Sequence, residues 1–144
     1  MESWAWGLSL IALTMAVHAT GLVLVALVVE RFRDRLTSRH VLTTIVGLVC
    51  TVGLLLAALH VLEAGLWALA YWSLGAISSF AEAMLYSVDS ISTRGGSGLM
   101  LERQWQTMGA LEALDGMLLF GISTAFIFAF MQTYWLTIYP RGRH

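Results

Sequence analysis

The feature that most constrains this chain is the apolar block from Trp4 to Val29, in which His18 is the only titratable side chain. A helix needs about 20 apolar residues to cross a bilayer, and this block is long enough. A signal peptide is the competing interpretation, but the basic residues follow the block and none precedes it. The block therefore predicts a membrane-spanning helix.

Two further apolar stretches predict two more spanning helices. The stretch that starts at Val41 is interrupted at 73–79 by serines and a glycine. Its first part predicts a helix over 41–72, which is long enough to cross the membrane with tilt or overhang. The last apolar stretch predicts a third spanning helix over 105–138.

A short helix is predicted between the second and third spans. A capping-box sequence begins at Ser79 and opens a helix over 80–91, which is about 18 Å long at 1.5 Å per residue. This length is about half of a hydrocarbon core. A loop rich in glycine follows at 92–99. A half-length helix followed by such a loop predicts a re-entrant segment, whose backbone must be buried in protein or face water.

The composition agrees with an all-α integral membrane protein. Charged residues make up 12% of the chain and hydrophobic residues 58%, whereas a soluble domain has roughly 25% charged residues. The net charge of −1 argues against a nucleic-acid partner. The single Cys excludes a disulfide within the chain. We expect no cofactor and no resident metal.

The arginines predict the orientation in the membrane. Four arginines follow the first span, between Glu30 and His40, and two more lie in the tail at 139–144. Short loops rich in arginine stay on the cytoplasmic side. We therefore expect a multi-pass protein of a bacterial inner membrane, with the N-terminus outside and the C-terminus in the cytoplasm. The segment 1–40 then consists of the first spanning helix and an arginine-rich cytoplasmic loop.

The order spanning helix, half-length helix, glycine-rich turn, spanning helix is the arrangement of pore-loop channels. The C-terminal carbonyls of the half-length helix carry partial negative charge, which favours a cation. One loop cannot enclose a pore, but four copies around an axis can, so a homotetramer is expected. Residues 41–138 then form a pore domain with an outer helix (41–72), a pore helix (80–91), a filter-like loop (92–99) and an inner helix (105–138).

Several runs between Gly65 and Phe130 carry a family resemblance. They are Leu66-Trp67-Ala68-Leu69-Ala70-Tyr71, Tyr86-Ser87, Ser92-Thr93, Trp105, Leu111-Glu112-Ala113-Leu114, Gly116 and Leu119-Phe120-Gly121-Ile122-Ser123-Thr124-Ala125-Phe126. In these runs the chain resembles small bacterial members of the two-transmembrane-type potassium channel family, some of which have an extra N-terminal helix. The resemblance covers a little under half of the chain. It implies passive conduction of monovalent cations, with potassium as the candidate ion, by a tetramer in contact with membrane lipids.

The filter positions depart from the family pattern Thr-X-Gly-Tyr-Gly-Asp. They read Thr93-Arg94-Gly95-Gly96-Ser97-Gly98 in this chain. Arg94 and Gly96 replace the two side chains that brace the family filter, so potassium selectivity is not implied. A buried Arg94 would cost at least ~2.5 kcal/mol at membrane depth unless paired. We hypothesise that a network with Asp89, Glu112 or Asp115 replaces the missing brace.

Other residues of the predicted spans have two interpretations each. Gly116 and Gly121 are expected either as hinges of the inner helix or as sites of close helix packing. Ser123 and Thr124 are expected to present hydroxyls to an inner cavity.

His60 and Glu63 share one face of the second span, because they are three residues apart. This pair is compatible with a proton-sensing site, a metal site, a site for a polar lipid, or a hydrogen bond that fixes helix packing. Two residues are too few for a metal site, and the packing interpretation is the simplest. His18 is expected as a polar contact between helices, at a similar depth to His60.

Two alternatives to conduction remain. The first is a non-conducting channel homologue with a structural, sensory or partner-binding role. The second is a proton or metal pathway that uses His18, His60 and Glu63. An enzyme is not expected, although Gly95-Gly96-Ser97-Gly98 matches the Gly-X-Ser-Gly motif of rhomboid-type proteases. That chemistry requires a histidine base, and His144 at the end of the chain is the only histidine that follows the serine.

Overall fold

The computed structural model describes residues 2–31, 41–95 and 98–138, with the side chains of 41, 42 and 134–138 left out. The predicted loop at 32–40, the tail at 139–144 and the filter positions Gly96 and Ser97 lie outside the described residues.

Every regular element in the described ranges is a helix, so the predicted all-α class is confirmed. The helices are α1 (Glu2–Glu30), α2 (Val41–Ser73), α3 (Phe80–Ile91) and α4 (Gln106–Ile138). The three longer helices are long and apolar enough to cross a membrane, which fits a multi-pass membrane protein.

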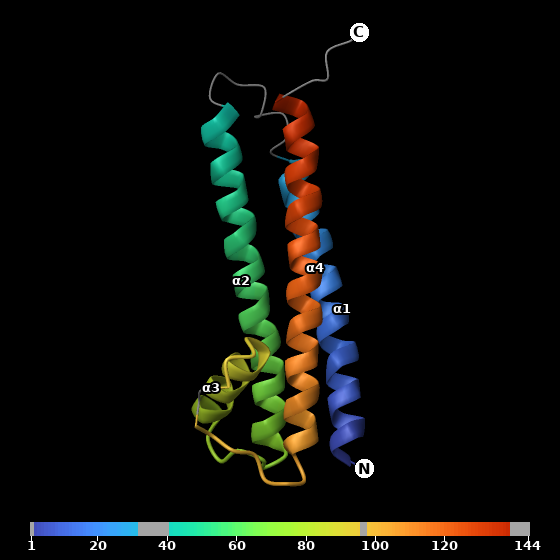
Figure 1. The fold of residues 1–144 in the computed structure, drawn as a ribbon, viewed down its shortest axis with the longest axis vertical. Coiled ribbons are helices and arrows are strands. Elements are labelled where there is room, and N and C mark those ends of the chain that lie inside the picture. The colour runs from blue at the N-terminus through green and yellow to red at the C-terminus, as the bar shows by residue number, and fades with distance from the viewer. Residues whose placement is uncertain (1, 32–40, 96–97, 139–144) are drawn as a thin grey trace.

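The three long helices lie side by side as a bundle (Figure 1). α1 and α4 run in the same direction, and α2 runs in the opposite direction. The short helix α3 packs against α2 and α4, at the end of the bundle where α1 begins and α2 ends. α1 packs against both α4 and α2, so it closes the bundle on the side away from α3 (Figure 1).

The outer surface of the bundle is apolar. Large side chains face outwards along all three long helices, as in Val23 (59% exposed), Leu54 (73%) and Phe128 (63%). A helix that is hydrophobic all round belongs in the core of a large protein or in a membrane. Lipid or other protein chains must therefore cover this surface.

The interior consists of two apolar clusters with polar side chains between them. One cluster surrounds Trp67, Tyr71 and Met108 near α3. The other lies towards the far end of α1 and the start of α2, around Val25 and Val52. The buried polar and charged side chains between these clusters are Thr14, His18, Glu63, Asp115 and Ser123.

The start of α3 differs in one detail from the prediction. Ser79 is the N-cap residue with an extended backbone, but its side chain makes no capping hydrogen bond. The hydroxyl of Ser78 instead donates to the Glu82 carboxylate at 3.4 Å. The capping-box prediction placed the helix start correctly, but its side-chain contact was wrong, because the preceding serine makes the contact with Glu82.

The C-terminal end of α3 packs directly on the backbone of α4 at Gly116. A Cβ atom at Gly116 would overlap the carbonyl oxygen of Ile91 and would lie 2.9 Å from the carbonyl carbon. Gly116 follows Gln106 by ten residues, which is about 15 Å along α4. The glycine therefore serves a close approach of α3 to α4, and its hinge role stays a prediction.

We expect Gly116→Ala to destabilise the protein, because the added methyl group meets backbone atoms that cannot rotate away. Overpacking of this kind costs about 1–3 kcal/mol. Gly121→Ala is the matched control, because a Cβ there meets nothing within 4 Å and alanine favours a helix by up to about 1 kcal/mol. Thermal unfolding in detergent, followed by circular dichroism, measures both variants. Equal midpoints for the two variants would contradict the close approach.

Candidate functional site

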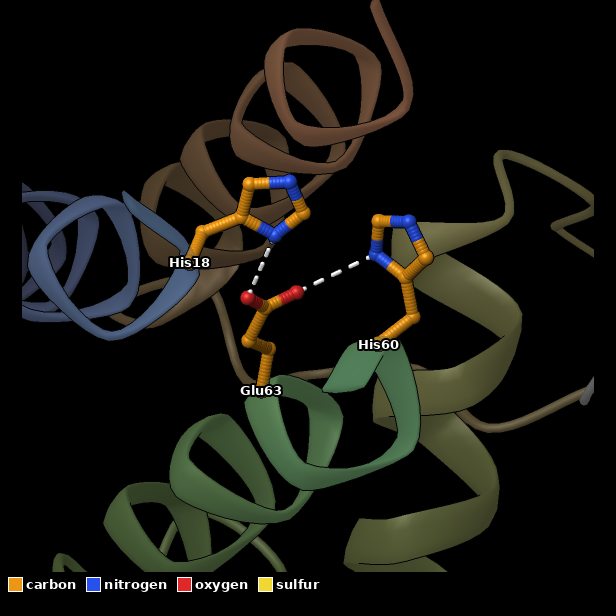
Figure 2. Close-up of side chains that lie close together, drawn as sticks. All are labelled: His18, His60 and Glu63. Atoms are coloured by element: carbon orange, nitrogen blue, oxygen red, sulfur yellow. Dashed lines mark hydrogen bonds and ion pairs between the residues drawn. The ribbon is translucent and has the colours of Figure 1, made fainter. Parts of the chain in front are cut away.

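Four side chains from three helices form a closed ring of hydrogen bonds, which we call the His–Glu ring. Glu63 of α2 lies between two histidines, with Oε1 at 2.8 Å from Nδ1 of His18 and Oε2 at 3.1 Å from Nδ1 of His60 (Figure 2). Ser123 of α4 closes the ring, since its Oγ lies 3.1 Å from Nε2 of each histidine. The predicted pair His60 and Glu63 is thus joined by His18 from α1 and Ser123 from α4.

The ring is buried in the middle of the bundle. Glu63 is 0% exposed, His18 1% and His60 11%. The His60 ring stacks on Phe120 with 4.3 Å between ring centroids, and the two imidazole rings are 5.3 Å apart. Packing therefore holds each imidazole ring in one orientation.

The four hydrogen bonds of the ring need one more hydrogen than its neutral side chains and ionised carboxylate supply. Its four hydrogen bonds need four hydrogens, whereas two neutral imidazoles and one hydroxyl supply three and an ionised carboxylate supplies none. One additional proton completes the ring and cancels the charge of the carboxylate. The ring can then lie inside an apolar bundle with no net charge and every hydrogen bond made, which avoids the cost of an isolated charge in a membrane.

A second polar layer lies one helical turn away, towards α3. Oδ2 of Asp115 accepts hydrogen bonds from the Thr14 hydroxyl at 2.7 Å and from Trp67 Nε1 at 3.0 Å. Within the part of the chain that the structure describes, Oδ1 of Asp115 is buried without a hydrogen-bond partner. Asp115 therefore links α1 and α2 to α4 and keeps one acceptor unused.

A third layer follows one turn further along α2. The Tyr71 hydroxyl donates to Glu112 Oε2 at 3.0 Å. Glu63, Trp67 and Tyr71 are spaced by four residues on α2, so the three layers follow one face of that helix over about 12 Å. Three buried carboxylates, one in each layer, thus line the contact between α2 and α4.

Arg94 forms an ion pair with Asp89, through Nε and Oδ1. The backbone N–H of Arg94 also donates to the backbone oxygen of Asp89 at 3.0 Å. The turn after α3 brings these two residues together, and Asp89 is 3% exposed whereas the Arg94 side chain is 65% exposed in the isolated chain.

The hypothesis pairs Arg94 with Asp89, Glu112 or Asp115, and the structure pairs it with Asp89, while the other two acidic side chains bond elsewhere. Glu112 bonds Tyr71, and Asp115 bonds Thr14 and Trp67. Asp115 therefore faces α1 and α2, whereas Glu112 faces α2 and also Ser87 of α3. The Arg94 side chain is 65% exposed in the isolated chain, so burial behind the loop is not found there.

Two other predicted filter residues, Thr93 and Gly95, border a cavity of about 330 Å³ between α3, α4 and the following loop. Thr93 and Gly95 lie on opposite sides of Arg94 in sequence, and both have positive φ, as does Gly98. Burial, together with the charges of Glu112 and Asp89, raises the pKa of Tyr86 to about 12, so this phenol stays protonated at neutral pH. The cavity is lined by Tyr86, Asp89, Ser90, Thr93, Gly95, Leu99 and Ala113.

The remaining predicted residues of α4 separate from one another. Ser123 belongs to the His–Glu ring, so its hydroxyl faces the interior of one chain. Thr124 is exposed and its hydroxyl donates to the Phe120 backbone oxygen at 2.8 Å. Only Thr124 of this pair is therefore placed where it can face another chain or a cavity outside the bundle.

His18 lies beside His60 and contacts other helices, as expected, whereas sequence reasoning missed Thr14 in α1 and Trp67 and Tyr71 in α2. Thr14 and His18 are four residues apart in the first apolar segment of the chain, and this spacing places both on one helix face. That spacing was the available signal for a polar face of α1. Trp67 and Tyr71 carried no such signal, because both are also ordinary interior residues.

Comparisons with protein-family models, with curated proteins and with solved structures find no match to this chain.

We expect Asp115→Asn to destabilise the protein less than Asp115→Leu does, because the amide oxygen can accept both existing hydrogen bonds, although the NH2 group replaces the buried Oδ1 that has no partner among the described residues. Asp115→Leu leaves the buried Trp67 N–H without its acceptor, which costs about 1–3 kcal/mol. Thermal unfolding of both variants in detergent tests this ranking. A loss for Asp115→Asn as large as that for Asp115→Leu would show that the charge itself is required.

Proposed function

We propose that this protein is a pore-loop, cation-channel-like membrane protein that conducts monovalent cations passively through a non-standard filter. The observation that carries the proposal is the contact between the C-terminal end of α3 and Gly116, about 15 Å along α4. A helix of 12 residues that ends at this point beside a helix long enough to span a membrane is what a pore helix requires, and this supports the proposal.

The path of the chain supports a re-entrant segment. α3 follows the end of α2 and packs against α2 and α4, and the chain then returns to the start of α4 at the same end of the bundle (Figure 1). If the three long helices cross the membrane, residues 80–105 enter and leave it on one side. Residues 92–95 and 98 are exposed in the isolated chain, so neighbouring chains or a water-filled path would have to surround them to allow irregular backbone at membrane depth.

The electrostatics at the end of α3 favour a cation. The last carbonyl groups of a helix carry partial negative charge, and Asp89 lies in the last turn of α3 beside the cavity. Arg94 offsets the charge of Asp89. The loop therefore offers backbone and hydroxyl oxygens with little net charge, which supports cation conduction without specifying potassium.

A tetramer accounts for the apolar surface of α3 and the loop. Phe80, Leu85 and Val88 of α3 are about half exposed in the isolated chain, and Met100 is 89% exposed. Neighbouring chains around a pore axis would cover part of this surface, and lipid the rest. Six of the eight arginines lie between α1 and α2 or after α4 in the sequence. Because segments rich in arginine stay in the cytoplasm, they support an orientation with the N-terminus outside and the C-terminus in the cytoplasm.

Flux through purified protein in liposomes tests conduction. We expect potassium and sodium flux in proteoliposomes and no chloride flux, with native mass spectrometry reporting four chains per assembly. Empty liposomes are the control. An intact tetramer that passes no cation under any gradient would contradict conduction and favour the non-conducting structural or sensory role. A stable monomer would contradict the pore.

A charge substitution in the loop tests whether the loop lines the cation path. Arg94→Gln removes a positive charge and leaves the charge of Asp89, so we expect cation flux to rise. For a unit charge at an assumed distance of about 8 Å from the path and an effective dielectric constant of about 20, the interaction is about 2 kcal/mol, which corresponds to a rise of roughly 30-fold.

Arg103→Gln is the matched control for this substitution. Arg103 is also exposed and lies three residues before α4. Its substitution by Gln therefore removes the same charge at a different place. An equal effect of the two substitutions would indicate a general surface-charge effect and would contradict the assignment of residues 92–99 to the path.

A further inference from the structure

We propose that His18, His60 and Glu63 form a binding site for a divalent transition-metal ion of the Zn²⁺ class. One ligand atom from each residue lies within 4.8 Å of the others. Two imidazoles and one carboxylate are an established zinc ligand set. Two of these residues were too few for a metal site by sequence, and His18 supplies the third from another helix.

The ligand atoms are close to the separations that a metal requires. The carboxylate oxygens of Glu63 lie 2.8 Å and 3.1 Å from the two Nδ1 atoms (Figure 2). Ligands bound to Zn²⁺ at about 2.0–2.1 Å in a tetrahedron are about 3.3 Å apart. The two contacts with Glu63 must therefore lengthen by a few tenths of an ångström. The ligand atoms of the two histidines, which lie within 4.8 Å of each other, must approach by up to about 1.5 Å to reach the tetrahedral separation, which side-chain rotation can supply.

Ser123 does not bind the metal itself but can accept a hydrogen bond from each of the two histidines. With both Nδ1 atoms on the metal, each histidine carries its hydrogen on Nε2. Both Nε2 atoms lie 3.1 Å from Ser123 Oγ, and a hydroxyl oxygen has two lone pairs to accept them. Metal-binding histidines nearly always donate their second N–H in this way, and loss of the acceptor weakens metal binding about 10- to 100-fold.

The charge balance also favours a divalent ion. A 2+ ion on one carboxylate leaves a single positive charge in the bundle. Asp115 lies in the adjacent polar layer, where Thr14 binds it one turn before His18, and its Oδ1 is buried without a hydrogen-bond partner among the described residues. The carboxylates of Glu63 and Asp115 together therefore match the charge of one divalent ion.

The inference is independent of conduction, because the site lies inside one chain, between α1, α2 and α4. The four side chains can be satisfied in two ways. One is the hydrogen-bonded ring with an additional proton, and the other is a metal ion in place of the hydrogens between Glu63 and the two histidines. Metal binding would tie α1 to α2 directly and to α4 through Ser123.

Metal binding to the purified full-length chain, free of affinity tags and stripped with a chelator, tests the proposal. We expect one Zn²⁺ per chain by equilibrium dialysis and elemental analysis. Co²⁺ is expected to give the intense visible absorption of a four- or five-coordinate site, without the thiolate charge-transfer band that ligation by Cys50 would produce. Zn²⁺ should also raise the thermal midpoint of the wild-type protein.

Three variants separate the ligands from Ser123. Glu63→Gln and His18→Gln are expected to abolish the Co²⁺ spectrum and the Zn²⁺-dependent rise of the midpoint. Ser123→Ala is expected to keep the spectrum and to weaken binding about 10- to 100-fold. His144→Gln, which removes a histidine of the terminal tail, is the control and should bind one ion with unchanged affinity.

Several results would overturn the proposal. They are less than one ion per wild-type chain, a thiolate band in the Co²⁺ spectrum, or binding that His18→Gln leaves unchanged. If His18→Gln does not give a monodisperse protein, the wild-type stoichiometry and spectrum and the Ser123→Ala affinity decide the question. A wild-type protein that folds stably and binds no Zn²⁺ would assign the four side chains to the proton-closed ring alone.

Discussion

The fold depends on polar contacts buried between helices that are apolar on every side. Lipid tails are as apolar as leucine, so hydrophobic burial gives little drive for such helices to associate in a membrane. The contacts of Thr14 and His18 with Asp115, Glu63 and Ser123 join α1 to both other long helices. Each contact fixes the rotation of a helix as well as its depth, because a polar group turned towards lipid would lose its partner.

The need to bury polar groups between helices distinguishes two regions of the molecule. The polar layers hold α1, α2 and α4 together within one chain, whereas α3 and its loop lie at the edge of the bundle. Gly116 connects the two regions, since it brings the end of α3 onto α4 just beyond Asp115 in the sequence. The rigid interior of one chain thus positions the loop, which is free to contact other chains.

Sequence reasoning predicted the helices well, because it depends on local composition. The breaks at 73–79 and the glycines after Ile91 place α3 at the predicted residues, and Arg94 pairs with one of its three expected partners. Contacts across helices were harder to predict. α2 and α4 are apolar all round, so no hydrophobic face indicates which side of Glu112 or Asp115 meets a neighbour. His18 and Glu63 are 45 residues apart, and only the packed helices bring them together.

The position of His18 has a consequence for biosynthesis. α1 leaves the ribosome before α2 and α4 exist, so it enters the membrane with two polar side chains and no partners from other helices. The hydroxyl of Thr14 has a hydrogen-bond partner before the other helices are made, because it lies 2.9 Å from the backbone oxygen of Leu10 in its own helix. His18 has no such substitute, and its partner Glu63 follows 45 residues later. The polar contacts of α1 begin to form only once the second half of α2 has been synthesised, and they are complete only after α4, which supplies Asp115 and Ser123.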